Sequence, residues 1–289
     1  MIEGRAGGAR VLRGVREAFE LTIYVDAKET DADSLPTVTV VRANGAAVAT
    51  AAATTKPAST TGLYRWTPAQ PDVAEVERYT ATWSVTLSGV AHSFVTYHEI
   101  VGAFYCDLQA LRAQEGLEDL ARFPDARLVD ARRWFEDLAE RFCKRAFVLR
   151  YEREIHSGDG GTILQLERRP ARRLLAVSIG ATALTVADLD LERSGRLSYE
   201  GGFALGESNV AISYVHGDDE PDGELRDAAV EAIADRVRRS ISGVSERSLS
   251  MTTGEGTFNL SIAGPDRPTG LPSVDQVLRT RRGSAVVVR

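Results

Sequence analysis

The chain of 289 residues contains only two cysteines, Cys106 and Cys143, and no stretch that approaches the roughly 18 consecutive apolar residues of a membrane helix. Two cysteines without CxxC spacing argue against a disulfide scaffold or a zinc site and predict buried thiols. Residues 1–16 carry four arginines but no apolar core, so no secretory signal is visible. Hydrophobic residues make up 43% and charged residues 26%, as in soluble globular proteins. We expect a protein made in a cytoplasm, without membrane contact.

Lysine is scarce as well, so the positive charge is almost entirely arginine. The net charge is −6 and the isoelectric point is near 5.4. A protein that binds duplex DNA through its phosphates usually has a basic surface, which argues against a nucleic-acid binder but not against a protein past which DNA slides. Residues 245–289 are the exception, because their six arginines exceed their four carboxylates.

Catalytic and metal-binding motifs are also missing. The sequence has four histidines, no HExxH and no GxSxG, so no catalytic arrangement can be argued from them. The glycine-rich turn at 157–161 lacks the Lys-Ser/Thr of a phosphate loop. Acidic residues at 218–224 precede a predicted helix, where the helix dipole stabilises carboxylates. We expect no enzyme activity, no metal and no cofactor.

The first hundred residues show the period-2 alternation of β-strands. Asn44-Gly45 is a hairpin signal, and Gly89 turns the chain after the clearest alternating run. Regularly spaced strands without a helical stretch predict an immunoglobulin-like β-sandwich over residues 17–102, preceded by an N-terminal arm of residues 1–16. Since no cysteine pair joins its sheets, packing around Trp66 and Trp83 must stabilise it.

A second domain of two long helices with β-hairpins is predicted over residues 103–244, which makes the chain an α+β protein of two domains. Asp107 is a plausible N-cap for a short helix. The first long helix runs from Pro124 to about Arg145, and the second from about Pro221 to Ser242. The apolar stripe of the first helix recurs at steps of three and four residues, and consists of Leu128, Ala131, Phe135, Leu138 and Phe142. Its charged side carries Arg132, Arg133, Asp137 and Glu140.

Residues between the helices return to β, with hairpins predicted around residues 157–161 and around Gly180. The strand after the first of these turns, at 163–166, is expected to pair with the strand before it. Residues 245–289 lack a long periodic segment and are predicted to be an extended arm with at most one short helix at 274–278. The alternation around Gly254 and Gly256 is typical of either a hairpin or an extended segment. The arm is expected to contribute little to the stability of the subunit and to pack on a partner.

Several segments resemble, in order and spacing over roughly 185 residues, the head-to-tail adaptors of long-tailed bacteriophages. The helix segment is PDARLVDARRWFEDLAERFCKRAFV, and the strand and turn segment is YEREIHSGDGGTILQLERRP. The second helix follows in VAISYVHGDDEPDGELRDAAVEAIADRV, and the tail contains RSLSMTTGEGTFNLSIAG and TGLPSVDQVL. The N-terminal stretch ARVLRGVREAFELTIYVDA and the junction HEIVGAFYCDLQALRA resemble the amino-terminal module of adaptors from actinobacteriophages.

This resemblance implies a structural virion protein of the neck, at the head–tail interface, that completes the DNA-filled head. Its subunits would form a ring, usually twelve-fold, between the portal protein and a tail-side connector (a stopper or tail terminator), with duplex DNA passing through the lumen. The helix faces at Arg132, Arg133, Asp137, Glu140 and Arg236 would pack the ring. The arm would bind the portal or a neighbour, through Phe258, Leu260, Ile262, Gly270, Leu271, Pro272, Val274 and Leu278.

Two other functions stay open. A carbohydrate- or surface-binding accessory module, carried by the immunoglobulin-like domain, predicts exposed aromatic residues near Tyr64 and Trp66, and burial of both would count against it. An enzyme with an unrecognised site predicts a deep cleft lined by histidine and carboxylates.

Overall fold

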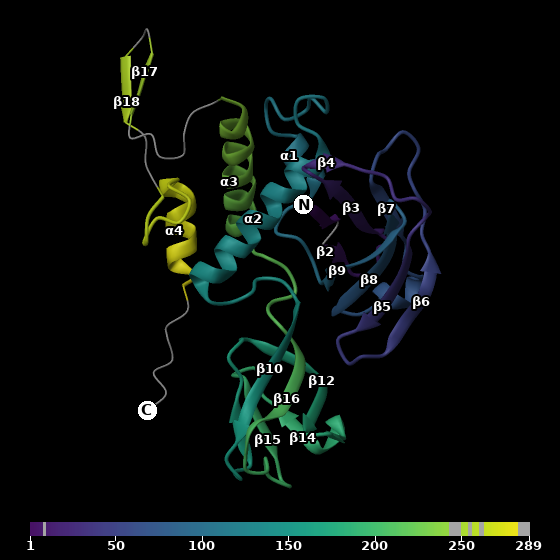
Figure 1. Cartoon of the computed structure of the whole chain (residues 1–289). Helices are drawn as coiled ribbons and strands as arrows, with labels where there is room; N and C mark the ends of the chain where they lie inside the picture. The colour runs from purple at the N-terminus through teal and green to yellow at the C-terminus, as the bar shows by residue number, and fades with distance from the viewer. Residues whose placement is uncertain (8–9, 243–249, 254–255, 260–262, 283–289) are drawn as a thin grey trace. The chain divides into compact units, whose positions relative to one another are not determined.

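The computed structural model describes residues 1–7, 10–242, 250–253, 256–259 and 263–282 (Figure 1). The chain is an α+β protein with most of its regular structure in β-sheets, and the described residues contain four α-helices. Contacts divide it into two compact units. The first unit comprises Met1–Ala103, Leu149–Glu167 and Ala171–His216. The second, which we call the helical unit, comprises Phe104–Val148, Arg168–Pro170 and Gly217–Arg289.

The N-terminal strands form two sheets around one core. One sheet has the order β1-β3-β4 with β7 also paired to β3, and the other has the order β2-β9-β8-β5-β6. The strands of the first sheet are β1 (Ile2–Gly7), β3 (Phe19–Val25), β4 (Lys28–Glu29) and β7 (Leu63–Trp66). Those of the second are β2 (Arg10–Leu12), β5 (Thr37–Arg42), β6 (Ala47–Ala53), β8 (Glu77–Leu87) and β9 (Val90–Val101). A short 3-10 helix, Gln70–Val73, precedes β8.

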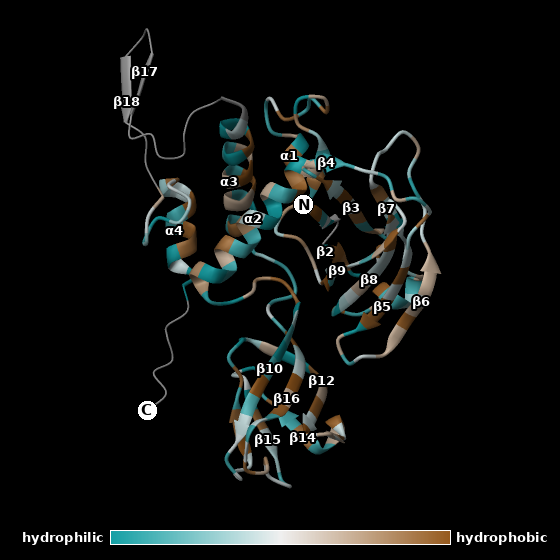
Figure 2. Cartoon of the chain, viewed as in Figure 1, coloured by the Kyte–Doolittle hydropathy of each residue, from teal (hydrophilic) through white to brown (hydrophobic). Residues whose placement is uncertain are grey.

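Alternation along the strands fills this core, as the hydropathy colours in Figure 2 show. Phe19, Leu21 and Ile23 of β3 are fully buried, and they share one cluster with Trp83 of β8. The predicted burial of Trp83 is confirmed, whereas Trp66 is half-buried against Phe19, with ring centroids 5.4 Å apart. A two-sheet arrangement around a shared core results, and its finer immunoglobulin-like topology stays a prediction.

Residues 1–16 are not an arm outside this β structure. β1 pairs with β3 along its whole length, and β2 runs parallel to the end of β9. Val11 is fully buried in the core. The prediction was wrong because two short strands, one of them rich in glycine and arginine, give no visible alternation.

The strands between the long helices form a second pair of sheets, with the orders β10-β16-β12-β13 and β11-β15-β14. Their core includes Leu174 and Tyr214 from the first sheet and Leu197 from the second. The bounds are β10 (Arg150–Gly158), β11 (Ile163–Gln165), β12 (Ala171–Ile179), β13 (Thr182–Leu184), β14 (Leu189–Leu191), β15 (Arg196–Tyr199) and β16 (Gly206–His216), with a 3-10 helix at Val186–Asp188.

The β12–β13 hairpin around Gly180 confirms a prediction, but the expected pairing of the strands around residues 157–161 is wrong. β10 pairs with β16, and β11 pairs with β15 in the other sheet. The turn is held across the structure, since Gly160 N donates to Phe203 O (2.8 Å) and Phe203 N donates to Gly161 O (2.7 Å). It therefore carries the chain from one sheet to the other.

This second β part groups with the N-terminal strands and not with the helices, unlike the predicted domain of residues 103–244. Gly102 N donates to Leu149 O (3.0 Å), and Arg150 donates two 2.7 Å hydrogen bonds to Glu99. Val76 of the N-terminal part is buried in one cluster with Tyr151 of β10 and with Val215 of β16. These long-range contacts have no signal in local sequence patterns.

Four helices make up the regular structure of the helical unit, together with a hairpin of two strands. Their bounds are α1 (Leu108–Arg112), α2 (Asp125–Cys143), α3 (Gly223–Ser242), α4 (Pro272–Thr280), β17 (Ser250–Thr253) and β18 (Gly256–Asn259). The N-cap of α1 is confirmed, since Ala110 N donates to the Asp107 carboxylate (2.6 Å). α2 ends at Cys143, and its C-cap residue, Lys144, has the left-handed conformation (φ 55°). β17 and β18 pair antiparallel, so this stretch forms a hairpin, one of the two forms that the sequence left open.

Candidate functional site

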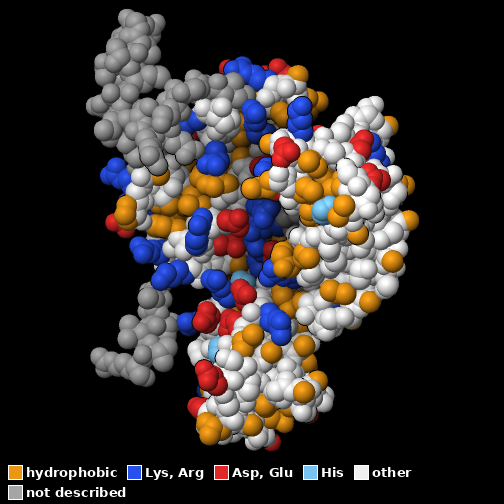
Figure 3. All heavy atoms as spheres, in the orientation of Figure 1, with side chains coloured by type: hydrophobic (Ala, Val, Ile, Leu, Met, Phe, Trp, Pro, Cys, Tyr) orange, Lys and Arg blue, Asp and Glu red, His pale blue; other side chains and the backbone are white. Residues whose placement is uncertain are grey.

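Helices α2 and α3 pack together and form the frame of the helical unit. Of the predicted stripe on α2, Leu128, Ala131 and Phe135 are buried, while Leu138 and Phe142 are half-buried. The buried face continues instead through Ala139 and Cys143. A helix that packs against neighbours on more than one side buries a wider face than a single apolar stripe indicates. Charged side chains gather over the helical unit on the face that Figure 3 shows.

Arg132 does not belong to a solvent-facing ring surface, and this prediction was wrong. Its side chain is buried, with 7% of the residue exposed. The guanidinium lies 3.5 Å from the ring centroid of Phe104, and its Nη1 donates to Cys106 O (3.4 Å). A charged residue thus belongs to the buried face, because its planar group stacks on an aromatic ring and reaches a backbone acceptor.

The other predicted ring residues divide into one exposed side chain and three with contacts inside the chain. Arg133 is exposed, and Asp137 is half-buried. Glu140 accepts a hydrogen bond from the Tyr105 hydroxyl (3.3 Å). Arg236 of α3 lies 4.1 Å from the ring centroid of Trp134 on α2, so this pair joins the two helices. Arg133 is therefore the one of these residues whose side chain is exposed.

The arm residues on α4 are not free anchors for a partner. α4 packs against α2 and α3, and both Val274 and Leu278 are fully buried there, while Leu271 is half-buried. The thiol of Cys143 donates to Leu278 O (3.3 Å). The prediction of an arm that packs only on a partner is wrong for this helix, because a short amphipathic helix buries its apolar side on its own subunit.

The predicted turn before α4 is present: Gly270 adopts a positive φ (77°), and Pro272 begins the helix. Leu260 and Ile262 lie outside the described residues. Phe258 lies in β18, where it pairs with Met251, but its side chain also lies outside the described part of the chain.

A charged clamp at the end of α4 was missed by the sequence reasoning. Arg281 donates to both carboxylate oxygens of Asp222, at 2.9 and 2.7 Å, and to Glu224 at 2.8 Å. Asp222 also accepts from Leu225 N (2.9 Å), so it caps α3 while it binds the end of α4. The bond with Arg281 lowers the pKa of Asp222, and the bond with Asp222 raises the pKa of Arg281. The available signal was the acidic cluster before α3 together with the arginines that follow α4.

The start of α4 is held by a buried carboxylate. Asp275 is fully buried, and its Oδ1 accepts from the backbone N (2.9 Å) and from the hydroxyl (2.7 Å) of Thr269. Ser273 donates to Glu231 on α3 (2.6 Å). Both ends of α4 are thus bound by polar groups, while its centre is bound by apolar packing.

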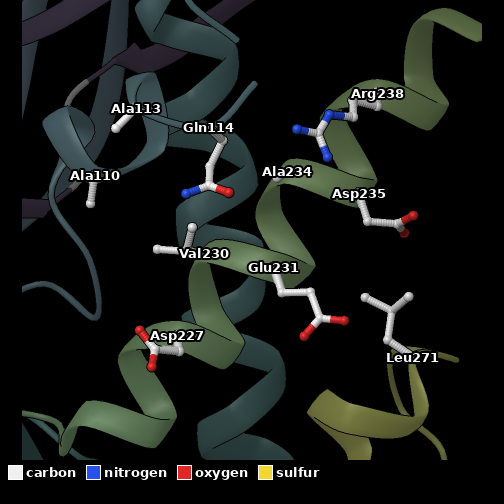
Figure 4. Close-up of a pocket in the computed structure, with 10 residues that line it drawn as sticks. All are labelled: Ala110, Ala113, Gln114, Asp227, Val230, Glu231, Ala234, Asp235, Arg238 and Leu271. Carbon is white, nitrogen blue, oxygen red and sulfur yellow. The ribbon is translucent and has the colours of Figure 1, made fainter. Parts of the chain in front are cut away.

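A groove crosses the outer face of α3 (Figure 4). α1 forms one wall, Leu271 lies at the opposite side, and the space amounts to about 690 Å³. The lining on α3 combines apolar Val230 and Ala234 with acidic side chains at Asp227, Glu231 and Asp235, and with Arg238. Apolar Ala110 on α1 completes it, together with Ala113 and the polar side chain of Gln114, which directly follow α1. The rim is mixed in charge, because Asp235 pairs with Arg239 (2.8 Å) and Glu231 accepts the hydrogen bond from Ser273.

Two histidines and both cysteines lie in contacts within the fold. His156 Nε2 lies 2.8 Å from the carboxylate of Glu154, which also accepts from the Tyr214 hydroxyl. The His98 ring is stacked on Phe19, with centroids 4.0 Å apart. Burial raises the pKa of Cys106 to about 12 and that of Cys143 to about 11. Within the described residues, no cluster of histidine, cysteine and carboxylate side chains could hold a metal ion.

Among the described residues, the helices are too short or too polar to cross a membrane.

Comparison with known proteins gives little. No family model matches the chain, and no curated protein matches it. Among solved structures, the chain is similar over 34% of its length to a DUF4785 family protein from Legionella pneumophila, at 10% identity and a TM-score of 0.23. It covers 27% of that protein. A likeness of this size carries no argument about fold or function.

Proposed function

We propose that this chain is a head-to-tail adaptor of a long-tailed bacteriophage, a structural protein of the virion neck. Its subunits form a ring, twelve-fold as is usual in the family, that joins the portal protein to the tail-side connector and leaves a channel for DNA. The acidic net charge supports a channel of this kind, because an acidic lumen does not attract phosphates and lets DNA pass.

One observation carries the proposal: the segments that resemble adaptors contact one another, although they are far apart in the sequence. β10 pairs with β16, and α2, α3 and α4 pack together. The segments that carry the resemblance are therefore packing partners in the fold, and not unrelated local patterns. Arg133, exposed on α2, is the proposed ring contact.

The test is attachment of the full chain to purified DNA-filled heads that carry the cognate portal but no tail. We expect the chain to sediment with these heads and to form a ring beneath the portal in cryo-electron microscopy averages, while heads without portal bind none. The variant Arg133→Glu should weaken ring formation, whereas Lys28→Glu, an equal charge change at an exposed position in β4, should not. Failure of the wild-type chain to bind portal-bearing heads would overturn the proposal.

The alternative of a carbohydrate-binding accessory module loses part of its sequence support. Tyr64 is buried, and its hydroxyl oxygen accepts from Ala32 N (2.7 Å). Trp66 packs on Phe19, so neither side chain forms the exposed aromatic platform on which a sugar would stack.

A further inference from the structure

The groove on α3 has an apolar floor and an unpaired charge of opposite sign at each end. Val230 and Ala234 form the floor, and both lie between Asp227 and Arg238 on the helix (Figure 4). Since Asp227 and Arg238 are eleven residues apart, they lie on the same side of α3, about 16.5 Å apart along its axis. Within the described part of the chain neither of them takes part in an ion pair, and Arg238 donates to the backbone O of Glu115 (2.5 Å). The other two acidic side chains of the lining are already bound within the chain.

The loop between α1 and α2 carries the complement of this groove. Leu120 is 63% exposed, and among the described residues of the helical unit it is the one large hydrophobic side chain that is exposed. Glu118 lies two residues before it and Arg122 two residues after it, and both are exposed. Neither forms an ion pair within the described residues. The loop thus presents a leucine between an acid and a base, as the groove presents an apolar floor between an acid and a base.

Contacts within the chain fix the shape of this loop. Arg112 donates to the backbone O of Leu117 and of Phe123 (2.6 Å each), and both of these side chains are buried. The Asp119 carboxylate accepts from two backbone N–H groups of the turn that follows it, at 2.9 and 3.2 Å. Leu120 is exposed and does not line the groove of its own chain. A fixed loop presents this side chain to a second molecule with little loss of conformational entropy.

We propose that the α1–α3 groove of one subunit binds the Leu120 loop of a second copy of this chain. The leucine covers the apolar floor, the basic side chain of the loop meets Asp227, and its acidic side chain meets Arg238. Both ion pairs include a long arginine side chain, so they can reach the two ends of the groove. Loop and groove are different surfaces of one subunit, so the contact is head-to-tail, and repeated contacts of this kind close into a ring where the rotation between subunits permits. The inference rests on the proposed function, because it names the contact between neighbours in the proposed ring.

Disulfide trapping between two differently substituted full-length chains tests the contact. One chain carries Leu120→Cys and the other Val230→Cys, and the two are mixed in equal amounts under mild oxidation. In one matched control Leu35→Cys, at an exposed leucine of the first unit, replaces Leu120→Cys. In the other, Val186→Cys, at a half-buried valine of the first unit, replaces Val230→Cys. The native thiols are buried, so they compete little with the new ones.

We expect the mixed dimer of Leu120→Cys with Val230→Cys to form roughly tenfold faster than either control dimer, because docking raises the effective concentration of the two thiols. Intact mass identifies each dimer. Equal rates for the mixed dimer and the controls overturn the inference. A dimer of two Leu120→Cys chains that forms fastest also overturns it, because the contact would then join loop to loop.

Charge reversal gives a second readout that a general loss of folding cannot imitate. Arg122→Glu in the loop-bearing chain should slow the mixed cross-link about fivefold, and Asp227→Arg in the groove-bearing chain should restore its rate. Asp190→Arg, at an exposed carboxylate of the first unit, should not restore it. The inference is wrong if Asp227→Arg gives no recovery, or if Asp190→Arg gives the same recovery.

Attachment to portal-bearing heads separates this contact from the proposed function. If the wild-type chain attaches to heads while the mixed cross-link forms at the control rate, the contact is overturned and the adaptor function is not. If the mixed cross-link is specific while the wild-type chain does not attach, the contact is supported and the adaptor function is overturned.

Discussion

Truncation of Leu278 to alanine tests whether α4 is a structural part of the subunit. The side chain is fully buried between α4 and the long helices, and the backbone carbonyl of the same residue accepts from Cys143. Gln276 on the same helix is exposed, so Gln276→Ala is the matched control. The two variants differ in burial and share the same short helix.

The expected loss follows from core truncations. Replacement of a buried leucine by alanine costs about 2–5 kcal/mol of unfolding free energy. A short helix near the end of a chain can detach before the rest unfolds, and the cost is then limited to the free energy with which α4 docks. We therefore expect Leu278→Ala to cost about 2–3 kcal/mol, at the low end of that range. Gln276→Ala should stay within about 0.5 kcal/mol of the wild type.

The unfolding free energy of both variants is measured by urea titration, with the circular dichroism signal of the helices as the readout. If Leu278→Ala detaches the whole helix, a further Val274→Ala substitution should add less than its own single cost, because both side chains act through one docking event. The reasoning is refuted if Leu278→Ala and Gln276→Ala have equal unfolding free energies. It is also refuted if removal of residues 264–289 leaves stability unchanged, as the sequence alone had suggested.

Three further predictions concern other contacts of the helical unit. Arg132→Ala should lower the unfolding free energy by about 2–3 kcal/mol, because it removes a buried, stacked guanidinium, and Arg133→Ala should change it by less than about 0.5 kcal/mol; chemical denaturation compares them. In the folded chain Arg281 lowers the pKa of Asp222 below its ordinary value of 3.8, so the clamp stabilises the fold above about pH 4 and this contribution is lost as the pH falls through the lowered value. A pH series of unfolding free energies should therefore show a smaller loss on acidification for Arg281→Gln than for the wild type, and equal slopes would contradict the clamp. Both native thiols should resist a thiol reagent at pH 8 until denaturant is added, because burial holds their pKa values at about 12 and 11, and rapid labelling of the native chain would show the opposite.

The sequence by itself determined most of the local structure, because periodicity and capping act over a few residues. The alternation in β3 and β8, the Asp107 cap and the bounds of α2 and α3 agree closely with prediction. The α+β class follows from the same patterns. Local signals of this kind need no knowledge of what lies across the fold.

Only the tertiary structure decided which segments pack together. The pairing of β10 with β16, and the grouping of that sheet with the N-terminal strands, depend on partners about 50 residues or more away in the sequence. The burial of Arg132 depends on Phe104, and the docking of α4 depends on a surface that α2 and α3 form only after they meet. An amphipathic helix or an arginine can face solvent, a neighbour or its own chain with the same sequence, and the packed surfaces around it select one of these.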